Sequence, residues 1–257
     1  MNTVNWLAFT LQMVLMILFP IGLAIFFKRR FHVSWVVFFI AAGFYLINLV
    51  VQLPLVFAWY SLFGKIPWLQ LALVTLTYAL CEETMRYLSF RAGSIMRANR
   101  TMNGALMAGA GHGGTESIIF AIGAAFTLST ALLMPQTSKV SRISVADIVN
   151  APWWTFILLG FSRVLAITTH LGLASLTVLA YRRSWLFYPL AIFAHFVLDF
   201  TTFGVQSLTS SSLWTLLVFA LWAIAALFLI LRIRHMDLAA PEQRSQHLEN
   251  SPTTITG

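Results

Sequence analysis

Residues 33–60 have the sequence VSWVVFFIAAGFYLINLVVQLPLVFAWY, which contains no Asp, Glu, Lys or Arg. About 20 apolar residues in a helix cross the hydrocarbon core of a bilayer, so this stretch is long enough for a transmembrane helix. Apolar stretches recur along the chain near residues 4–27, 33–60, 68–90, 103–134, 153–181, 185–203 and 213–231. The sequence therefore predicts an all-α fold, a polytopic membrane bundle of about seven transmembrane helices.

The composition of the whole chain agrees with a membrane protein. Of the 257 residues, 59% are hydrophobic and 9% are charged, whereas soluble domains contain roughly 25% charged residues. The net charge of +8 comes largely from Lys and Arg in short connections between apolar stretches, where basic residues set topology. We therefore expect the lipid bilayer, and no nucleic acid, as the partner of this chain. The single cysteine, Cys81, excludes a disulfide within it.

Basic residues are unevenly distributed between alternate connections. One set of connections holds most of the Lys and Arg residues, including Lys28, Arg29, Arg30, Arg182 and Arg183, whereas the other set holds Lys65, Lys139 and Arg142. The positive-inside rule then predicts an N-terminus outside and a C-terminus in the cytoplasm. We expect one transmembrane domain over residues 1–231, a disordered cytoplasmic tail over residues 232–257, and an extramembrane loop over residues 135–152.

Ionisable side chains lie inside the predicted membrane helices, where each costs about 2.5–3.5 kcal/mol on insertion scales. Because of this cost, such groups normally face the interior of a bundle and mark function. The alternative is that they form ion pairs that only hold helices together. We favour a functional site because so many occur in four helices: Glu82, Glu83, Arg86, His112, Glu116, Arg163, His170, His195 and Asp199.

The spacing of these residues predicts contacts on helix faces. Arg86 follows Glu82 by four residues and Glu83 by three, so its guanidinium can reach either carboxylate. Separations of four also place His112 with Glu116 and His195 with Asp199. The glycine-rich stretch 109–114 removes side chains around His112, which permits a close helix approach or a local break beside a cavity.

Four of these groups are expected at one depth in the membrane. Glu83, His112, His170 and His195 each lie roughly 12–18 Å along a helix from basic residues at its predicted cytoplasmic end. The four helices enter the membrane alternately from opposite sides, and unrelated core residues would have little reason to share a layer. The sequence therefore predicts one buried polar site in the cytoplasmic half of the bundle.

A carboxylate, several imidazoles and a guanidinium support more than one chemistry. A carboxylate base could activate water while imidazoles donate hydrogen bonds to the oxyanion of a tetrahedral intermediate. Three His with Glu or Asp could instead hold zinc with an open position for water, although the sequence has no His-Glu-x-x-His run. Proton-coupled transport also uses buried Glu, His and Arg, but the two halves show no repeat symmetry.

Arg163 is a candidate substrate-binding residue, because a guanidinium fork can pair with a carboxylate through two hydrogen bonds. A structural ion pair with Glu116 or Asp199 is the interpretation that we favour over substrate binding.

Three motifs together resemble a known family. They are Glu-Glu-x-x-Arg at residues 82–86, Gly-His-Gly-Gly-x-Glu at residues 111–116 and His-x-x-x-Asp at residues 195–199. In this order, on separate helices, they resemble the YhfC family of bacterial intramembrane proteases. That family is related to the CAAX prenyl endopeptidase and bacteriocin-processing superfamily. The superfamily motif is Glu-Glu-x-x-x-Arg, so Arg86 comes one position early in this chain.

The resemblance implies a multi-pass endopeptidase of the bacterial cell membrane that cleaves a membrane-embedded or membrane-proximal peptide. Glu82 or Glu83 would activate water, and His side chains with Asp199 would position or stabilise the intermediate. We expect a glutamate-dependent mechanism without a cofactor, and a zinc-dependent protease is the alternative. A noncatalytic membrane scaffold or chaperone subunit is a further alternative, because the scaffold subunit of gamma-secretase is similar in its seven helices and buried histidines.

Overall fold

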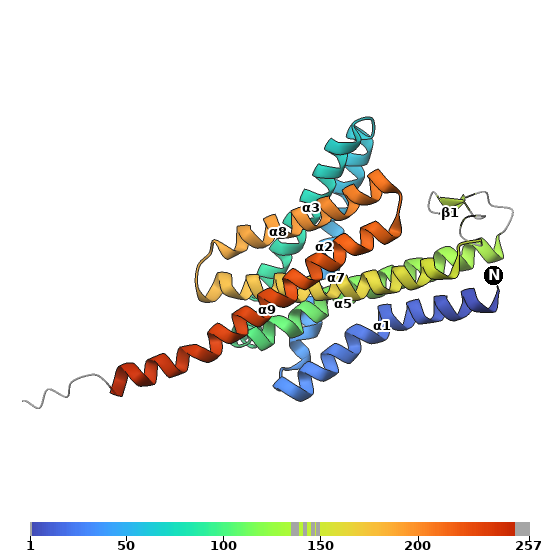
Figure 1. The fold of residues 1–257 in the computed structure, drawn as a ribbon. Coiled ribbons are helices and arrows are strands. Elements are labelled where there is room, and N and C mark those ends of the chain that lie inside the picture. Colours follow the sequence, from blue (N-terminus) through green and yellow to red (C-terminus); the bar gives the residue numbers. More distant parts are fainter. Residues whose placement is uncertain (1, 135–138, 141–142, 145–146, 148–149, 250–257) are drawn as a thin grey trace, which may run out of the picture.

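Long helices make up most of the chain, as the apolar stretches predict. The computed structural model describes residues 2–134, 139–140, 143–144, 147 and 150–249, with only the backbone for 139–140, 143–144 and 235–249. Figure 1 shows the arrangement of the elements. They are α1 (Thr3–Phe31), α2 (Trp35–Phe63), α3 (Pro67–Ser89), α4 (Gly93–Ala98), α5 (Met102–Leu133), β1 (Lys139–Val140), β2 (Ile143–Ser144), α7 (Trp153–Arg182), α8 (Phe187–Thr209) and α9 (Ser212–Glu249).

Six helices in the described part of the chain are long and apolar enough to cross a membrane: α1, α2, α5, α7, α8 and the Ser212–Arg234 part of α9. Helix α3 is also long, but its second half carries Glu82, Glu83 and Arg86. These three charged residues make α3 less apolar than the other six helices. Because α3 packs between α2 and α8 in the same bundle, we treat it as the seventh membrane helix.

Polar side chains at the connections start several helices where the sequence predicts them. The Ser34 hydroxyl accepts a hydrogen bond from the backbone N–H of Val36 at the start of α2. The Thr101 hydroxyl accepts one from the backbone N–H of Gly104 at the start of α5. Such caps satisfy N–H groups that have no partner within the helix. Between α5 and α7, β1 pairs antiparallel with β2 in the segment that we expected to be an extramembrane loop.

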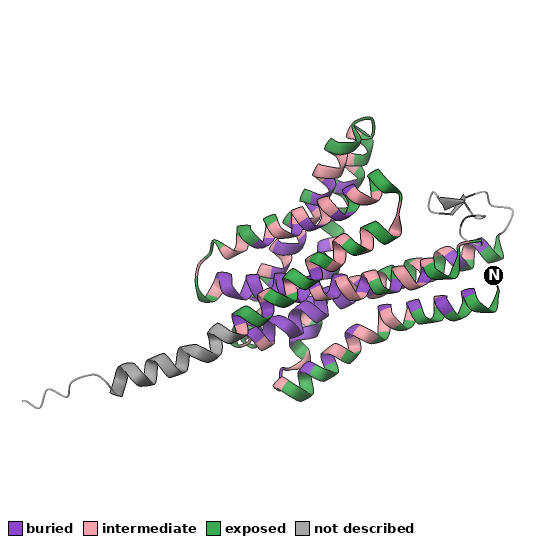
Figure 2. Cartoon of the chain, in the orientation of Figure 1, coloured by how far each residue is buried: buried purple, intermediate pink, exposed green. Residues whose placement is uncertain are grey.

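Helix α7 lies at the centre of the bundle. It packs against α1, α5, α8 and α9, and also contacts α3. Figure 2 shows buried residues concentrated where α7 crosses its neighbours, whereas the ends of the helices are exposed. Side chains projecting from α7 toward α3, α5 and α8 therefore meet in the interior, away from lipid.

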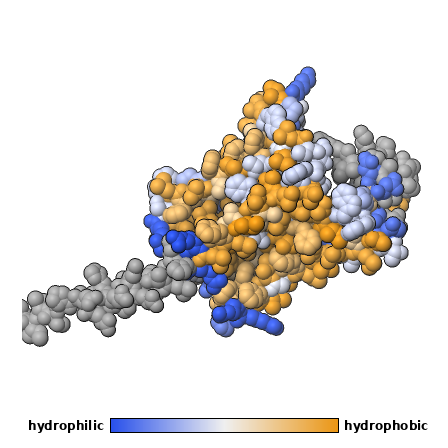
Figure 3. Space-filling view, viewed as in Figure 1, coloured by the Kyte–Doolittle hydropathy of each residue, from blue (hydrophilic) through white to orange (hydrophobic). Residues whose placement is uncertain are grey.

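The outer surface of the bundle is apolar. Figure 3 shows hydrophobic residues over most of the visible face and hydrophilic residues gathered toward the ends of the helices. Large apolar side chains such as Leu7, Val50, Phe57 and Phe228 are exposed, and contiguous apolar surface of this extent suits lipid rather than water. The chain is thus a multi-pass membrane protein, in agreement with the predicted cell-membrane location.

Helix α9 extends to Glu249, beyond the end of the last apolar stretch. Its membrane-spanning part ends at Arg234, close to the boundary at residue 231 that we expected between the transmembrane domain and the tail. That division stays a prediction, and residues 250–257 of the expected tail lie outside the described residues.

Candidate active site

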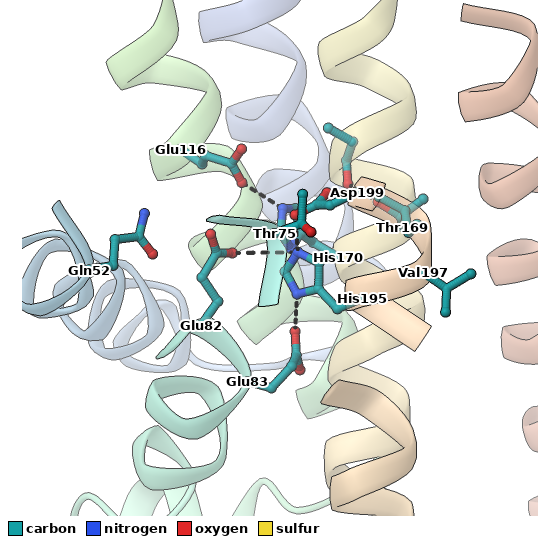
Figure 4. A network of polar contacts seen from close by, with 12 residues as sticks. Gln52, Thr75, Glu82, Glu83, Glu116, Thr169, His170, His195, Val197 and Asp199 are labelled. Carbon is teal, nitrogen blue, oxygen red and sulfur yellow. Dashed lines mark hydrogen bonds and ion pairs between the residues drawn. The ribbon is translucent and has the colours of Figure 1, made fainter. Parts of the chain in front are cut away.

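The ionisable residues predicted from the sequence meet in one buried cluster. Helix α3 contributes Glu82, Glu83 and Arg86, α5 contributes His112 and Glu116, α7 contributes Arg163 and His170, and α8 contributes His195 and Asp199. Figure 4 shows carboxylates from three of these helices directed toward the imidazoles of His170 and His195. The structure thus brings these side chains together in one cluster, whereas their depth in the membrane and their catalytic roles stay predictions.

Glu83 is the most completely enclosed member of the cluster, with an exposed fraction of 0%. Arg86 donates to both of its oxygens, from Nε to Oε2 at 3.0 Å and from Nη2 to Oε1 at 3.2 Å. His195 Nδ1 lies 2.8 Å from Glu83 Oε1. Because the guanidinium keeps this carboxylate ionised and accepting, His195 donates from Nδ1, and its Nε2 is turned toward the rest of the cluster.

Glu82 has a different environment from its sequence neighbour. Its Oε2 lies 3.2 Å from His112 Nε2 and 4.0 Å from His195 Nε2. His195 Nε2 is also 3.6 Å from Asp199 Oδ2. The sequence allowed Arg86 to pair with either glutamate, and the structure places it on Glu83. Glu82 is therefore flanked by imidazoles rather than by a guanidinium.

Glu116 binds two residues of α7. Its Oε1 accepts from Arg163 Nη2 at 2.7 Å, and its Oε2 lies 2.6 Å from His170 Nε2. Arg86 Nη2 donates to His170 Nδ1 at 2.9 Å, so a neutral His170 carries its proton on Nε2 and donates it to Glu116. Arg163 thus makes the ion pair with Glu116 that we favoured. His112 shares a helix with Glu116 but pairs with Glu82 instead.

Glycines of α5 allow α7 to approach closely enough for these contacts. A Cβ atom at Gly109 would come within 2.9 Å of the backbone oxygen of His170, and one at Gly113 would lie 2.7 Å from the His170 ring. Helix α5 continues unbroken through this stretch. Of the two outcomes that the glycine-rich sequence allowed, the structure has the close approach and not the break.

A cavity of about 500 Å³ borders the cluster. Glu82, Glu116, Arg163, His170, His195 and Asp199 lie on its wall, and Glu83, Arg86 and His112 lie behind them. The polar side chains on the wall therefore face a space that can hold a ligand. The buried groups behind them contact these side chains on the side away from the cavity.

Among the residues on this cavity wall that the sequence did not single out are Tyr45, Gln52 and Tyr78. The Tyr45 ring lies 4.8 Å from the His112 ring in an edge-to-face arrangement. Tyr45, Asn48 and Gln52 are buried on one face of α2, at intervals of three and four residues. This polar face within an otherwise apolar stretch is the signal in the sequence that indicates a role for α2 at the site.

The cluster contains a group of atoms suited to a metal ion. One ligand atom each from Glu82, His112 and His170 lie within 4.8 Å of one another. Around zinc, with bonds of about 2.1 Å, tetrahedral ligand atoms are roughly 3.4 Å apart, so small side-chain movements would complete the shell. Two imidazoles and one carboxylate form the ligand set of catalytic zinc sites that keep a fourth position open. The residues present therefore fit zinc.

The chain is similar to one curated bacterial protein. It is 29% identical over 211 residues to the uncharacterized membrane protein YhfC of Bacillus subtilis (strain 168), a match that covers 69% of this chain and 76% of that protein. No solved structure matches the chain significantly.

A family model described as "YhfC intramembrane metalloprotease" matches residues 15–221. This description does not support our preference for a site without a cofactor, and it agrees with the metal-compatible group formed by Glu82, His112 and His170. The match also spans the four helices that contribute the polar cluster. The chain therefore belongs to the YhfC intramembrane metalloprotease family.

Proposed function

We propose that this protein is a zinc-dependent intramembrane endopeptidase whose reaction centre is the cluster around Glu82. The observation that carries the proposal is the grouping of Glu82, His112 and His170 ligand atoms within 4.8 Å, beside a cavity of about 500 Å³. Glu82 and His170 line that cavity, so a substrate in it would lie against the same side chains that would hold the metal.

Zinc, when bound, would polarise the carbonyl of the scissile bond and make a water molecule acidic enough to attack it at neutral pH. Glu82, His112 and His170 would supply the three protein ligands. A histidine ligand gives one ring nitrogen to the metal, so zinc would replace one of the two contacts that His170 makes, with Arg86 at Nδ1 or with Glu116 at Nε2. The remaining contact would fix the orientation of the ring. Such supporting contacts usually set ligand geometry in metal sites.

His195 is the best-placed donor for the developing oxyanion. As an imidazolium, His195 donates from Nδ1 to Glu83 at 2.8 Å and carries a second proton on Nε2, on the side of Glu82 and Asp199. The carboxylates around the ring favour this charged form. Both His195 and Asp199 line the cavity. We assign His195 to stabilising the intermediate. Glu83 would position His195 through its hydrogen bond, without contacting the substrate itself.

A metal-free mechanism is the second candidate, and it would use the same glutamate. Glu82 Oε2 lies between His112 and His195, at 3.2 Å and 4.0 Å from their Nε2 atoms. A carboxylate in this position could act as the general base for water, with the imidazoles as donors. In both mechanisms Glu82 acts at the reaction centre and Glu83 supports it.

Metal analysis combined with a cleavage assay separates the two mechanisms. Purified protein would be assayed on synthetic transmembrane peptides in liposomes, with and without a chelator, and its metal content measured in parallel. We expect bound zinc, loss of cleavage with chelator, and recovery on adding zinc back. Cleavage that survives complete metal removal would select the metal-free mechanism.

Substitution of Glu82 provides the residue-level version of this test. Glu82→Gln should lose bound zinc and lower the cleavage rate by at least roughly a hundredfold, as for loss of a group acting at the reacting centre. His32→Asn is the matched control, because His32 is an exposed histidine at the end of α1. Wild-type cleavage by Glu82→Gln would contradict both mechanisms.

A further inference from the structure

A second cavity lies beside the proposed reaction centre, between α1, α5 and α7. Its volume is about 550 Å³, and Phe9, Met16, Phe126 and Phe156 are among its mostly apolar lining residues. We call it the α1–α5–α7 groove. Pockets of about 300–1,000 Å³ accommodate drug-sized ligands, so the groove suits a few side chains of a larger molecule rather than a whole helix.

The groove and the cavity at the reaction centre adjoin each other. Met16, Ile119, Phe120 and Leu159 line both spaces. A molecule in the groove would therefore need to pass only these side chains to reach Glu116 and Glu82.

One polar group on the groove wall identifies the kind of ligand. Gln12 has an exposed fraction of 1%, and its Oε1 has no hydrogen-bond partner within the described residues. Its Nε2 only contacts Met16 Sδ at 3.6 Å. A buried carbonyl oxygen without a donor is costly, so a ligand that offers an N–H would be favoured there. A peptide in extended conformation offers backbone N–H groups, whereas a lipid acyl chain offers none.

We infer that the α1–α5–α7 groove binds apolar residues of the peptide substrate on one side of the scissile bond, with Gln12 Oε1 accepting a backbone N–H. This inference rests on the proposed peptidase function and adds the substrate's recognition element: an unwound apolar segment next to the cleavage site. Mostly aromatic and aliphatic walls with a few polar groups, among them Gln12, match the general character of such sites.

Photocrosslinking with a defined peptide tests the location. The probe is a synthetic peptide with an apolar core of about 20 residues, Lys at both ends and a photoreactive leucine analogue in the core. It would be reconstituted in nanodiscs with the full chain. Mass spectrometry should find crosslinks on groove residues of α1, α5 and α7. A photoreactive fatty acid, tested in parallel, should not label these residues preferentially.

Two variants and a control sharpen the test. A Cβ at Gly123, on the groove wall, would meet no atom within 4 Å, so Gly123→Leu can fill the groove without distorting α5. It should lower peptide labelling by roughly tenfold. Gly22→Leu is the control, because Gly22 is also exposed, has the same free space and lies outside both cavities. Gln12→Leu should lower labelling without lowering thermal stability, since it removes an unsatisfied buried carbonyl.

The outcomes separate the inference from the proposed function. Labelling of the groove without any cleavage of the peptide by the wild-type protein would support the groove and reject the peptidase. Cleavage with crosslinks located elsewhere, or equal labelling in Gly123→Leu and Gly22→Leu, would overturn the groove. Preferential labelling by the fatty acid would assign the groove to lipid and also overturn the inference.

Discussion

Adjacent residues on a helix can have unrelated partners, and Glu82 and Glu83 illustrate this. Successive side chains on an α-helix point in directions about 100° apart. Glu83 consequently faces Arg86 and His195 in a closed interior, while Glu82 faces the cavity and His112. One glutamate is neutralised within its own helix, and the other is available to a ligand.

The pair of Glu83 and Arg86 should be strongly coupled in stability. Arg86→Met would leave the Glu83 carboxylate buried without its main partner, which costs about 3–5 kcal/mol of unfolding free energy for a buried ion pair. The double variant Glu83→Gln/Arg86→Met should regain much of that stability, because neither remaining side chain is charged. Thermal unfolding in detergent measures both effects.

Activity of the same variants distinguishes positioning from mere stability. The double variant should stay roughly 10–100-fold slower in peptide cleavage, since His195 has lost the carboxylate that holds its Nδ1. It should still bind zinc when the metal is in excess, because none of the proposed ligands is changed, whereas loss of the Arg86–His170 contact should lower its zinc affinity. Full recovery of cleavage along with stability would show that Glu83 serves folding alone.

Helix α5 acts as the element against which α2 and α7 pack, and its glycines set the distances. A Cβ at Gly111 would collide with the backbone of Phe38 on α2, whereas one at Gly123 on the same helix would meet nothing within 4 Å. Gly111, next to His112, thus marks a close approach of another helix, whereas Gly123 does not.

Two alanine substitutions on α5 should therefore act in opposite directions. Gly111→Ala should lower the unfolding free energy by about 1–3 kcal/mol, as overpacking of an interior does. Gly123→Ala should be neutral or stabilising by up to about 1 kcal/mol, because alanine has the higher helix propensity. Melting temperatures of the purified variants give the comparison. A Gly111→Ala variant as stable as Gly123→Ala would show that helix propensity, and not the approach of α2, governs this face.

The sequence predicted which residues share the site better than it predicted their partners. Residue spacing gives the face and depth of a side chain along its own helix, and that was enough to bring Glu83, His112, His170 and His195 together. Spacing does not reveal which neighbouring helix faces a residue. For this reason His112 was grouped with Glu116, whereas packing pairs Glu116 with α7. The groove beside Gln12 could not be predicted from the sequence either, because it depends on how α1 crosses two helices that are distant in sequence.

The whole molecule should have a fixed orientation in the membrane. An odd number of spans, including α3, places the two termini on opposite sides, and the uneven distribution of Lys and Arg predicts a cytoplasmic C-terminus. A fluorescent protein fused to the C-terminus should fold and fluoresce, while an alkaline phosphatase fusion there should be inactive. An active phosphatase fusion would reverse the orientation and move the proposed site to the other half of the bilayer.

The pairing of Glu83 with Arg86 also bears on how the chain is made. The two residues are three apart on one helix, whereas His195 lies 112 residues beyond Glu83 in sequence. During synthesis, α3 can thus enter the bilayer with the Glu83 carboxylate already paired with the Arg86 guanidinium of the same helix. The centre itself becomes complete only once α8 arrives, so a nascent or truncated chain would remain inert toward surrounding membrane proteins.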